Sequence, residues 1–296
     1  MPSTAQIDRM QRDWSPLVIV GAPRTGTNLL RDLLTQLPGY GTWPCDEINY
    51  IWRHGNATHP NDEFGRELAR PGVKRFIRRA FGRIASAEGA RTVVEKTCAN
   101  SLRIGFVDEI LPEAKFVFLV RDGRDVVASS IERWRAPLEF RYLYKKAKYV
   151  PVSDLPYYAF RYVSSRFFKL FSSEKRLATW GPRFDGMEEF LQTRTLAEIC
   201  AHQWKRCTEK AEAELAEIDT ARVHRVKYED IIRQPARELE KTARFLNVAL
   251  SENQADHLTA RVRNTSVGRW RQALDAETLK RLEPIWGSAL ERNGYV

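Results

Sequence analysis

A short apolar run that leads through a glycine-containing loop into a helical pattern is the strongest constraint on how this chain folds. Leu17–Val20 is rich in β-branched residues and ends at Gly21, which predicts a buried strand of a parallel sheet. Residues 26–37 carry leucines at helical spacing, and the pattern stops at a Pro-Gly pair. Strand, loop and helix in this order predict a βα unit of an α/β fold.

Further strand and helix patterns alternate along the chain. Strands are predicted at 92–95, 115–120 and 223–228, and helices at 102–111, 124–134 and 236–246. This alternation is typical of a parallel sheet covered by helices. We therefore predict one α/β domain over residues 1–296, a P-loop-like three-layer fold with a central, mostly parallel sheet flanked by helices and a helical insertion.

The insertion is expected where the character of the sequence changes, between about Pro137 and Trp180. This stretch is rich in Tyr, Phe, Lys and Arg and has no clear strand pattern. We expect a helical insert or lid over about residues 137–190 rather than a second domain. Several aromatic and basic residues could either line an acceptor site or pack onto the core: Trp43, Trp52, Tyr157, Tyr158, Arg161 and Tyr162.

The formal net charge of +10 favours an anionic partner. Charge alone leaves open nucleic acid, an acidic membrane surface, a phosphorylated small molecule, or a basic surface that serves only solubility. No RNA-binding or helix-turn-helix pattern stands out, so we expect no nucleic-acid partner. The apolar runs are strand-sized, whereas a membrane span needs about 20 residues, so we expect no transmembrane segment.

The four cysteines form no CxxC pair and no Cys/His metal spacing, and the five histidines show no ligand pattern. We therefore predict no metal site and no disulfide framework. Cys200 and Cys207 are expected to pack on one helix face.

The N-terminal residues lack the apolar region of a signal peptide, so we expect a cytoplasmic protein. The sequence predicts no particular oligomeric state.

The loop after the first strand has the features of an anion-binding loop. Gly21 and Gly26 are spaced so that backbone N–H groups can wrap an oxyanion at a helix N-terminus, and Arg24 adds a planar cation. The spacing matches the start of a Walker A loop, but Thr27 and Asn28 stand where its Lys and Ser/Thr would follow. The pattern therefore predicts a metal-free site for a terminal anionic group; the alternative is a glycine turn without a ligand.

A second anion-binding pattern follows the strand at 115–120. Arg121 stands at the strand end, and Ser129 follows it on the predicted helix, so both could reach one phosphate beside the first loop. On its own, this segment could instead be a helix start with internal salt bridges.

Together, GAPRTGTNLL and FVFLVRDGRDVVAS resemble the PAPS-dependent sulfotransferase superfamily (PAPS, 3′-phosphoadenosine 5′-phosphosulfate). The first resembles the 5′-phosphosulfate loop in the Arg form of tyrosylprotein and many bacterial sulfotransferases; steroid and phenol sulfotransferases have Lys at the position of Arg24. The second resembles the 3′-phosphate motif. The resemblance covers about residues 16–134 and 222–272, and it implies PAPS as donor, PAP as product and no required metal.

The resemblance also implies donor-binding residues later in the chain. Tyr228, in a Tyr-Glu-Asp segment, corresponds to a tyrosine that contacts adenine, and residues 265–270 resemble a loop that closes over the 3′-phosphate. The donor-binding residues expected from the resemblance are Pro23, Arg24, Thr25, Gly26, Thr27, Asn28, Arg121, Ser129, Tyr228, Ser266, Gly268 and Arg269.

The catalytic base cannot be the histidine of small-molecule sulfotransferases, because Cys98 stands at its position after Lys96-Thr97. Tyrosylprotein and related sulfotransferases use a Glu shortly after the first helix, and Glu47 occupies that place, with Asp46 as the alternative base. Glu47 could otherwise cap a helix or pair with Arg53.

The resemblance further implies direct in-line transfer, with Lys96 and Arg24 stabilising the charge that develops on the sulfonate and the leaving group. Lys96 could otherwise be a surface lysine. The expected acceptor is a hydroxyl of a saccharide or other glycoconjugate, a lipid or a small metabolite. Two other functions stay open, a small-molecule kinase that uses ATP and Mg²⁺ and a non-catalytic binding protein.

Overall fold

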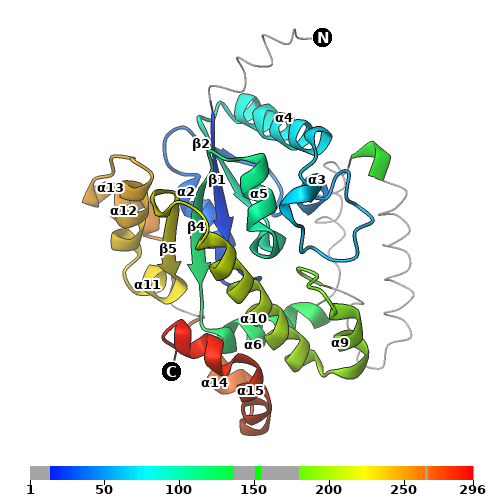
Figure 1. Ribbon diagram of the computed structural model, residues 1–296. Coiled ribbons are helices and arrows are strands. Elements are labelled where there is room, and N and C mark those ends of the chain that lie inside the picture. The colour runs from blue at the N-terminus through cyan, green and yellow to red at the C-terminus, as the bar shows by residue number, and fades with distance from the viewer. Residues whose placement is uncertain (1–13, 137–150, 155–179, 264–265, 296) are drawn as a thin grey trace.

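The computed structural model describes residues 14–136, 151–154, 180–263 and 266–295 (Figure 1). The expected insertion over about 137–190 lies mostly outside these residues, as do Tyr157, Tyr158, Arg161 and Tyr162. Within the region of the insertion, the described elements are η3 (Val152–Asp154) and the start of α9 (Met187–Thr193).

A five-stranded parallel sheet forms the centre of the described part, in the order β2-β3-β1-β4-β5. Its strands are β1 (Ser15–Val20), β2 (Tyr40–Thr42), β3 (Thr92–Lys96), β4 (Lys115–Val120) and β5 (Val223–Lys227). The register places Ile19 of β1 beside Lys96 of β3. The strand order reverses around β1, and ligands of open α/β sheets bind at the carboxyl ends of the strands at such a reversal.

Alternating residues of the strands bury against helices on both faces of the sheet. Val18 and Val20 of β1 belong to one apolar cluster, whereas Leu17 and Ile19 belong to another. The first face is covered by α3 (Asn49–Trp52), α4 (Pro71–Glu88), α5 (Ile104–Ile110) and the end of α10 (Leu196–Leu215). The second is covered by α2 (Thr27–Leu34), α11 (Tyr228–Arg233), α12 (Pro235–Phe245) and α13 (Glu252–Thr259). The predicted three-layer α/β fold is confirmed.

A third apolar cluster lies beyond the carboxyl edge of the sheet. There α10 packs against α6 (Gly123–Arg135) and α15 (Ala276–Arg292), with α9 and α14 (Trp270–Ala273) beside them (Figure 1). Cys200 and Cys207 are buried free thiols on α10, as expected from their spacing.

The local structure differs from the expectation at two places. The helix expected over 102–111 is present as α5 but begins at Ile104, because Arg103 has extended φ and separates it from a 3₁₀ turn, η2 (Cys98–Leu102). The strand β2 was not predicted, since three residues that include a glycine carry no periodic signal.

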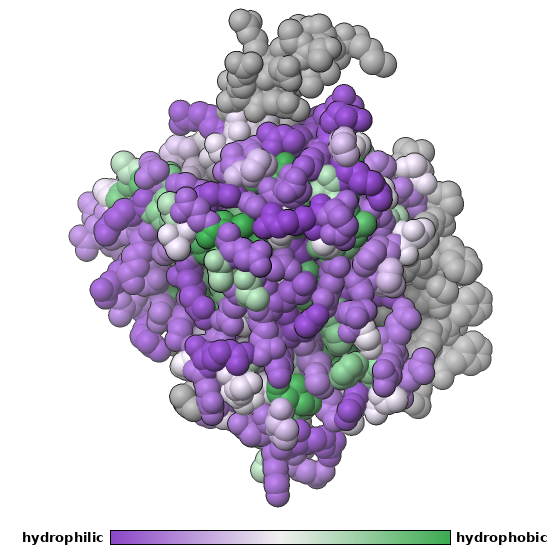
Figure 2. Space-filling view, viewed as in Figure 1, coloured by the Kyte–Doolittle hydropathy of each residue, from purple (hydrophilic) through white to green (hydrophobic). Residues whose placement is uncertain are grey.

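The visible face of the molecule is mainly hydrophilic, with scattered apolar side chains (Figure 2). Among the described residues, Val267 is the one large hydrophobic side chain that is exposed. No helix in the described ranges is both long and apolar enough to cross a membrane.

Candidate functional site

The loop between β1 and α2 holds a tight conformation that its glycine permits. Gly26 has a φ of 95°, and a Cβ atom there would lie 2.3 Å from Cδ2 of Tyr228. Arg24 has a φ of 67°, which is uncommon for a residue with a side chain and is found where a site constrains the backbone. Thr25 is buried and donates its hydroxyl to the carbonyl of Ala22 at 2.7 Å. The loop is therefore held by its own hydrogen bond and by close packing against Tyr228, which directly follows β5.

The two predicted anion-binding motifs meet at Arg24. Its Nε donates to Ser129 Oγ on α6 at 2.9 Å, and Arg121 Nη1 donates to the carbonyl oxygen of Arg24 at 2.9 Å. Burial lowers the pKa of Arg24, and the positive charges of Arg133 and Arg121 lower it further. Cations gathered at a partly buried position favour an anionic ligand, which would relieve their mutual repulsion.

Arg121 connects the loop between β1 and α2 to Tyr228 and to residues 266–270, which we call the late loop. Its Nη2 donates to the carbonyl of Ser266 at 2.5 Å, and its guanidinium lies 4.4 Å from the centroid of the Tyr228 ring. The Tyr228 hydroxyl and Ser266 Oγ are 2.5 Å apart. Arg121 Nε is buried and has no hydrogen-bond partner within the described part of the chain. A buried guanidinium nitrogen of this kind fits an anionic oxygen as its missing acceptor.

Asp125 fixes the late loop, a role that the sequence analysis did not assign. Its carboxylate accepts from the backbone N–H of Gly268 at 2.7 Å and of Trp270 at 2.9 Å. Gly268 and Ser266 thus lie beside the two motifs, as expected. The Arg269 side chain is 58% exposed and lies 3.5 Å from Glu132, and its contact with a phosphate stays a prediction.

Tyr295, at the end of the described chain, and Glu229 stabilise the second anion-binding motif, residues 121–129. Glu229 accepts from the backbone N–H of Asp122 at 3.0 Å and from the Tyr295 hydroxyl at 2.8 Å. Arg124 Nη2 donates to the carbonyl of Tyr295 at 2.8 Å. Sequence reasoning missed Tyr295, because nothing in its local pattern indicates a contact with residues so far away in the chain.

Glu47 and Lys96 form an ion pair at the carboxyl end of β3. Glu47 Oε1 accepts from Lys96 Nζ at 3.3 Å and from the backbone N–H of Cys98 at 3.4 Å. The Lys96 side chain is 3% exposed, which rules out the alternative of a surface lysine. The alternative partner of Glu47 is also ruled out, because Arg53 pairs with Asp62 at 2.8 Å.

The charges around Lys96 keep its ammonium protonated. Burial by itself would lower the pKa of Lys96, but the negative charges of Glu47 and Asp46 raise it above its ordinary value. Asp46 is more exposed and lies 3.5 Å from Arg31. Of the two adjacent acids, Glu47 is therefore the one that contacts the buried cation.

Thr27 links the anion-binding loop to Glu47 and Lys96. Its hydroxyl lies 3.9 Å from the sulfur of Cys98, whose own N–H contacts Glu47. Burial raises the pKa of Cys98 well above its ordinary value, and the charge of Glu47 raises it further, so the thiol is neutral. The anion-binding loop and the acid–lysine pair therefore belong to one site at the carboxyl edge of the sheet.

Some residues expected near an acceptor lie elsewhere. Trp43 and Trp52 are buried in the core, where both pack on Phe81, so they do not line an acceptor site. In the described ranges, no group of three or more His, Cys, Asp or Glu residues is arranged to hold a metal ion.

Comparison with known proteins identifies relatives of this chain. The model of the sulfotransferase family matches residues 16–149 and 159–252. The nodulation protein NoeE of Sinorhizobium fredii is 29% identical over 145 residues, which cover 43% of this chain and 35% of NoeE. The match thus spans about a third of the length of that relative.

Two solved structures share the fold. Sulfotransferase STF9 from Mycobacterium avium is similar with a TM-score of 0.54 at 14% identity, covering 95% of this chain and 77% of STF9. The sulfotransferase domain from the curacin biosynthetic pathway is similar with a TM-score of 0.51 at 15% identity, covering 92% of this chain and 96% of that domain. At these identities, the similarity supports the fold.

Proposed function

The chain belongs to the sulfotransferase family, and we propose that it transfers a sulfuryl group from PAPS to an acceptor hydroxyl. The observation that carries this proposal is the hydrogen bond of 2.9 Å between Arg24 and Ser129, which joins the two anion-binding motifs. One nucleotide that carries anionic groups at both its 5′ and 3′ positions would use both motifs at once. A nucleotide without a 3′-phosphate would leave Arg121 and Ser129 without their ligand.

The donor would be held by residues that follow three strands, β1, β4 and β5, and by the late loop. In this proposal, the backbone of residues 23–28 binds the 5′-phosphosulfate, and Arg121 and Ser129 bind the 3′-phosphate. The unpartnered Nε of Arg121 supports this assignment. Tyr228 and residues 266–269 close on the nucleoside.

Glu47 is the proposed general base. It takes the proton of the acceptor hydroxyl while the acceptor oxygen bonds to sulfur and the bond from sulfur to the bridging phosphate oxygen breaks, releasing PAP. Lys96 and Arg24 stabilise the negative charge on the sulfonate and the leaving oxygen. The contact between Glu47 and the buried Lys96 supports these roles, because it places a carboxylate and a cation together beside Thr27. We propose a saccharide or other glycoconjugate, a lipid or a small metabolite as the acceptor.

The donor assignment is tested by ligand-dependent thermal stability. A ligand at about 100 times its Kd stabilises the folded state by about 2.7 kcal/mol, so PAP should raise the Tm without metal, and ADP should do so much less. Ser129→Ala should remove most of the PAP response, whereas Ser130→Ala, a change at the buried neighbouring serine, should retain it. A response to ATP with Mg²⁺ and none to PAP would refute the donor assignment and favour a kinase.

Transfer itself is tested with ³⁵S-labelled PAPS and a panel of hydroxyl compounds that includes saccharides, lipids and small metabolites. Formation of a labelled product is the expected result. PAP binding without any labelled product or released sulfate would limit the function to nucleotide binding.

A further inference from the structure

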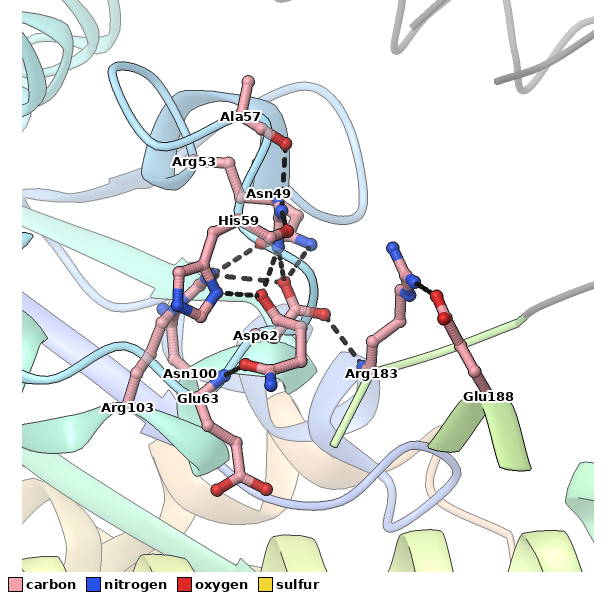
Figure 3. Close-up of polar contacts among 11 residues, drawn as sticks. Asn49, Arg53, Ala57, His59, Asp62, Glu63, Asn100, Arg103, Arg183 and Glu188 are labelled. Carbon is pink, nitrogen blue, oxygen red and sulfur yellow. Dashed lines mark hydrogen bonds and ion pairs between the residues drawn. The ribbon is translucent and has the colours of Figure 1, made fainter. Parts of the chain in front are cut away.

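Two buried arginines, Arg53 and Arg103, share the carboxylate of Asp62 (Figure 3). Asp62 Oδ1 lies 2.8 Å from Arg53 Nη1 and 3.5 Å from Arg103 Nη1, and all three side chains are at most 3% exposed. Burial by itself would raise the pKa of Asp62, but Arg103 and Arg53 hold it below its ordinary value. Buried ion pairs contribute little to stability compared with apolar residues of the same volume, so this cluster calls for a role other than stability.

One branch of the cluster reaches the loop that carries Glu47. Arg103 Nη2 donates to Asn49 Oδ1 at 2.5 Å, and Asn49 Nδ2 donates to Asp62 Oδ1 at 3.3 Å (Figure 3). The neighbouring backbone N–H of Ile48 donates to Thr97 Oγ1 at 3.1 Å. The two residues that follow Glu47 are therefore both held by hydrogen bonds, Ile48 to Thr97 after β3 and Asn49 to the cluster.

The other branch reaches the end of β3, which carries Lys96. Arg103 Nε donates to Asn100 Oδ1 at 2.9 Å, and Asn100 Nδ2 donates to Glu95 Oε2 at 2.8 Å. Glu95 is fully buried, and burial raises its pKa to about 7. The same guanidinium thus holds the loop of Glu47 and, through Asn100, the residue before Lys96.

We propose that Arg103 is a positioning residue that, through Asn49 and Asn100, holds Glu47 against Lys96. This role rests on the proposed function of Glu47 and Lys96. The loop needs such support because α3, which follows Glu47, has only four residues and no side-chain cap. A base must lie within about 3 Å of the proton that it takes, and a displacement of about 1 Å can lower the rate about 100-fold.

Asn49→Ala is the informative variant, because Arg103→Ala would leave Asp62 and Arg53 in an altered buried cluster and endanger folding. Asn49 is only partly buried, so its removal cuts the link to Glu47 at a small cost in structure. Asn61→Ala is the matched control. Asn61 precedes Asp62 in the chain, and its side chain donates to Asp185 and accepts from the backbone N–H of Glu63, both at 3.0 Å.

Asn49→Ala should speed hydrogen–deuterium exchange in the peptide over residues 46–49, and Asn61→Ala should not. Asn49→Ala should also lower kcat about 10- to 100-fold with the best acceptor and leave the Kd of PAP within about twofold. The alkaline limb of the kcat–pH profile should move to lower pH, because the pKa of Lys96 falls when Glu47 moves away. The other groups that face Lys96, the charged Asp46 and Arg31 and the neutral thiol of Cys98, stay in place.

Unchanged exchange and kcat in Asn49→Ala, or equal effects of the two variants, would overturn the positioning role. The proposed function fails in a different way, through a wild-type protein that neither binds PAP nor uses PAPS. In that case the exchange measurement still decides whether Asn49 holds the loop.

Discussion

Replacing Glu47 by glutamine removes the proposed base and keeps the size of the side chain. General bases contribute about 100- to 10,000-fold to a rate, so kcat should fall by that factor, which corresponds to about 3–5 kcal/mol in activation free energy. The Kd of PAP should change little, since the contacts of the donor motifs run through Arg24, Arg121 and Ser129. The kcat and the Kd therefore separate a base from a donor-binding residue.

The same substitution also changes the environment of the buried lysine. Two unit charges at 3.3 Å attract by roughly 5 kcal/mol at an effective dielectric constant of about 20. Desolvation and the 26% exposure of Glu47 reduce the net value, so the loss in unfolding free energy should be about 1–3 kcal/mol at pH 7. The folded-state pKa of Lys96 is raised, so its contribution is complete below the unfolded-state pKa and disappears as the pH rises through the folded-state value.

The assay is transfer from ³⁵S-labelled PAPS to the best acceptor, with urea unfolding of each variant in parallel. Asp46→Asn is the control, because Asp46 pairs with Arg31 on the more exposed side of the same loop. Its kcat should stay within about threefold of the wild-type value. If Glu47→Gln retained its activity and Asp46→Asn lost it, Asp46 would be the base. If both retained it, neither acid would be.

Three further outcomes follow from the site geometry. Gly26→Ala should lower the unfolding free energy by about 1–3 kcal/mol in urea, because its Cβ would collide with Tyr228 at a positive φ; an unchanged midpoint would contradict the close packing. Asp125→Asn should weaken PAP binding about tenfold in a calorimetric titration, because the N–H of Gly268 loses a charged acceptor; unchanged affinity would mean that the late loop does not contact PAP. Cys98 should resist alkylation by iodoacetamide at pH 8 until the protein unfolds, because burial raises the pKa of its thiol; rapid labelling of the folded protein, mapped by mass spectrometry, would contradict this.

The sequence was sufficient to predict the strands that carry the site. In β1 and β4 both faces are buried, so nearly every residue is apolar, and such runs stand out from their neighbours. Because all strands are parallel, their carboxyl ends share one edge, and this brings Arg24, Lys96, Arg121 and Tyr228 together as expected.

The side-chain partners at that edge could not be predicted in the same way. Asp125 was visible in the second motif, but its partners in the late loop are 143 and 145 residues away in the chain. The periodicity of a sequence indicates local structure and does not predict contacts between residues so far apart. For Trp43 and Trp52 the sequence left two alternatives open, an acceptor site or packing onto the core. The structure decides for the core, because both are buried against Phe81 of α4.

The buried arginines were the hardest feature to foresee. A sequence shows that Arg53 and Arg103 are charged, and charged residues are seldom fully buried unless they are paired, so the natural expectation places them at the surface. Their shared carboxylate, Asp62, lies between them in the chain and belongs to no motif. Glu47 and Lys96 are themselves separated by 49 residues in the chain. The sequence motifs identify these two residues but do not give the distance between their side chains. We infer that the distance between them depends on a cluster outside the donor motifs, so substitutions there should alter turnover before they alter nucleotide affinity.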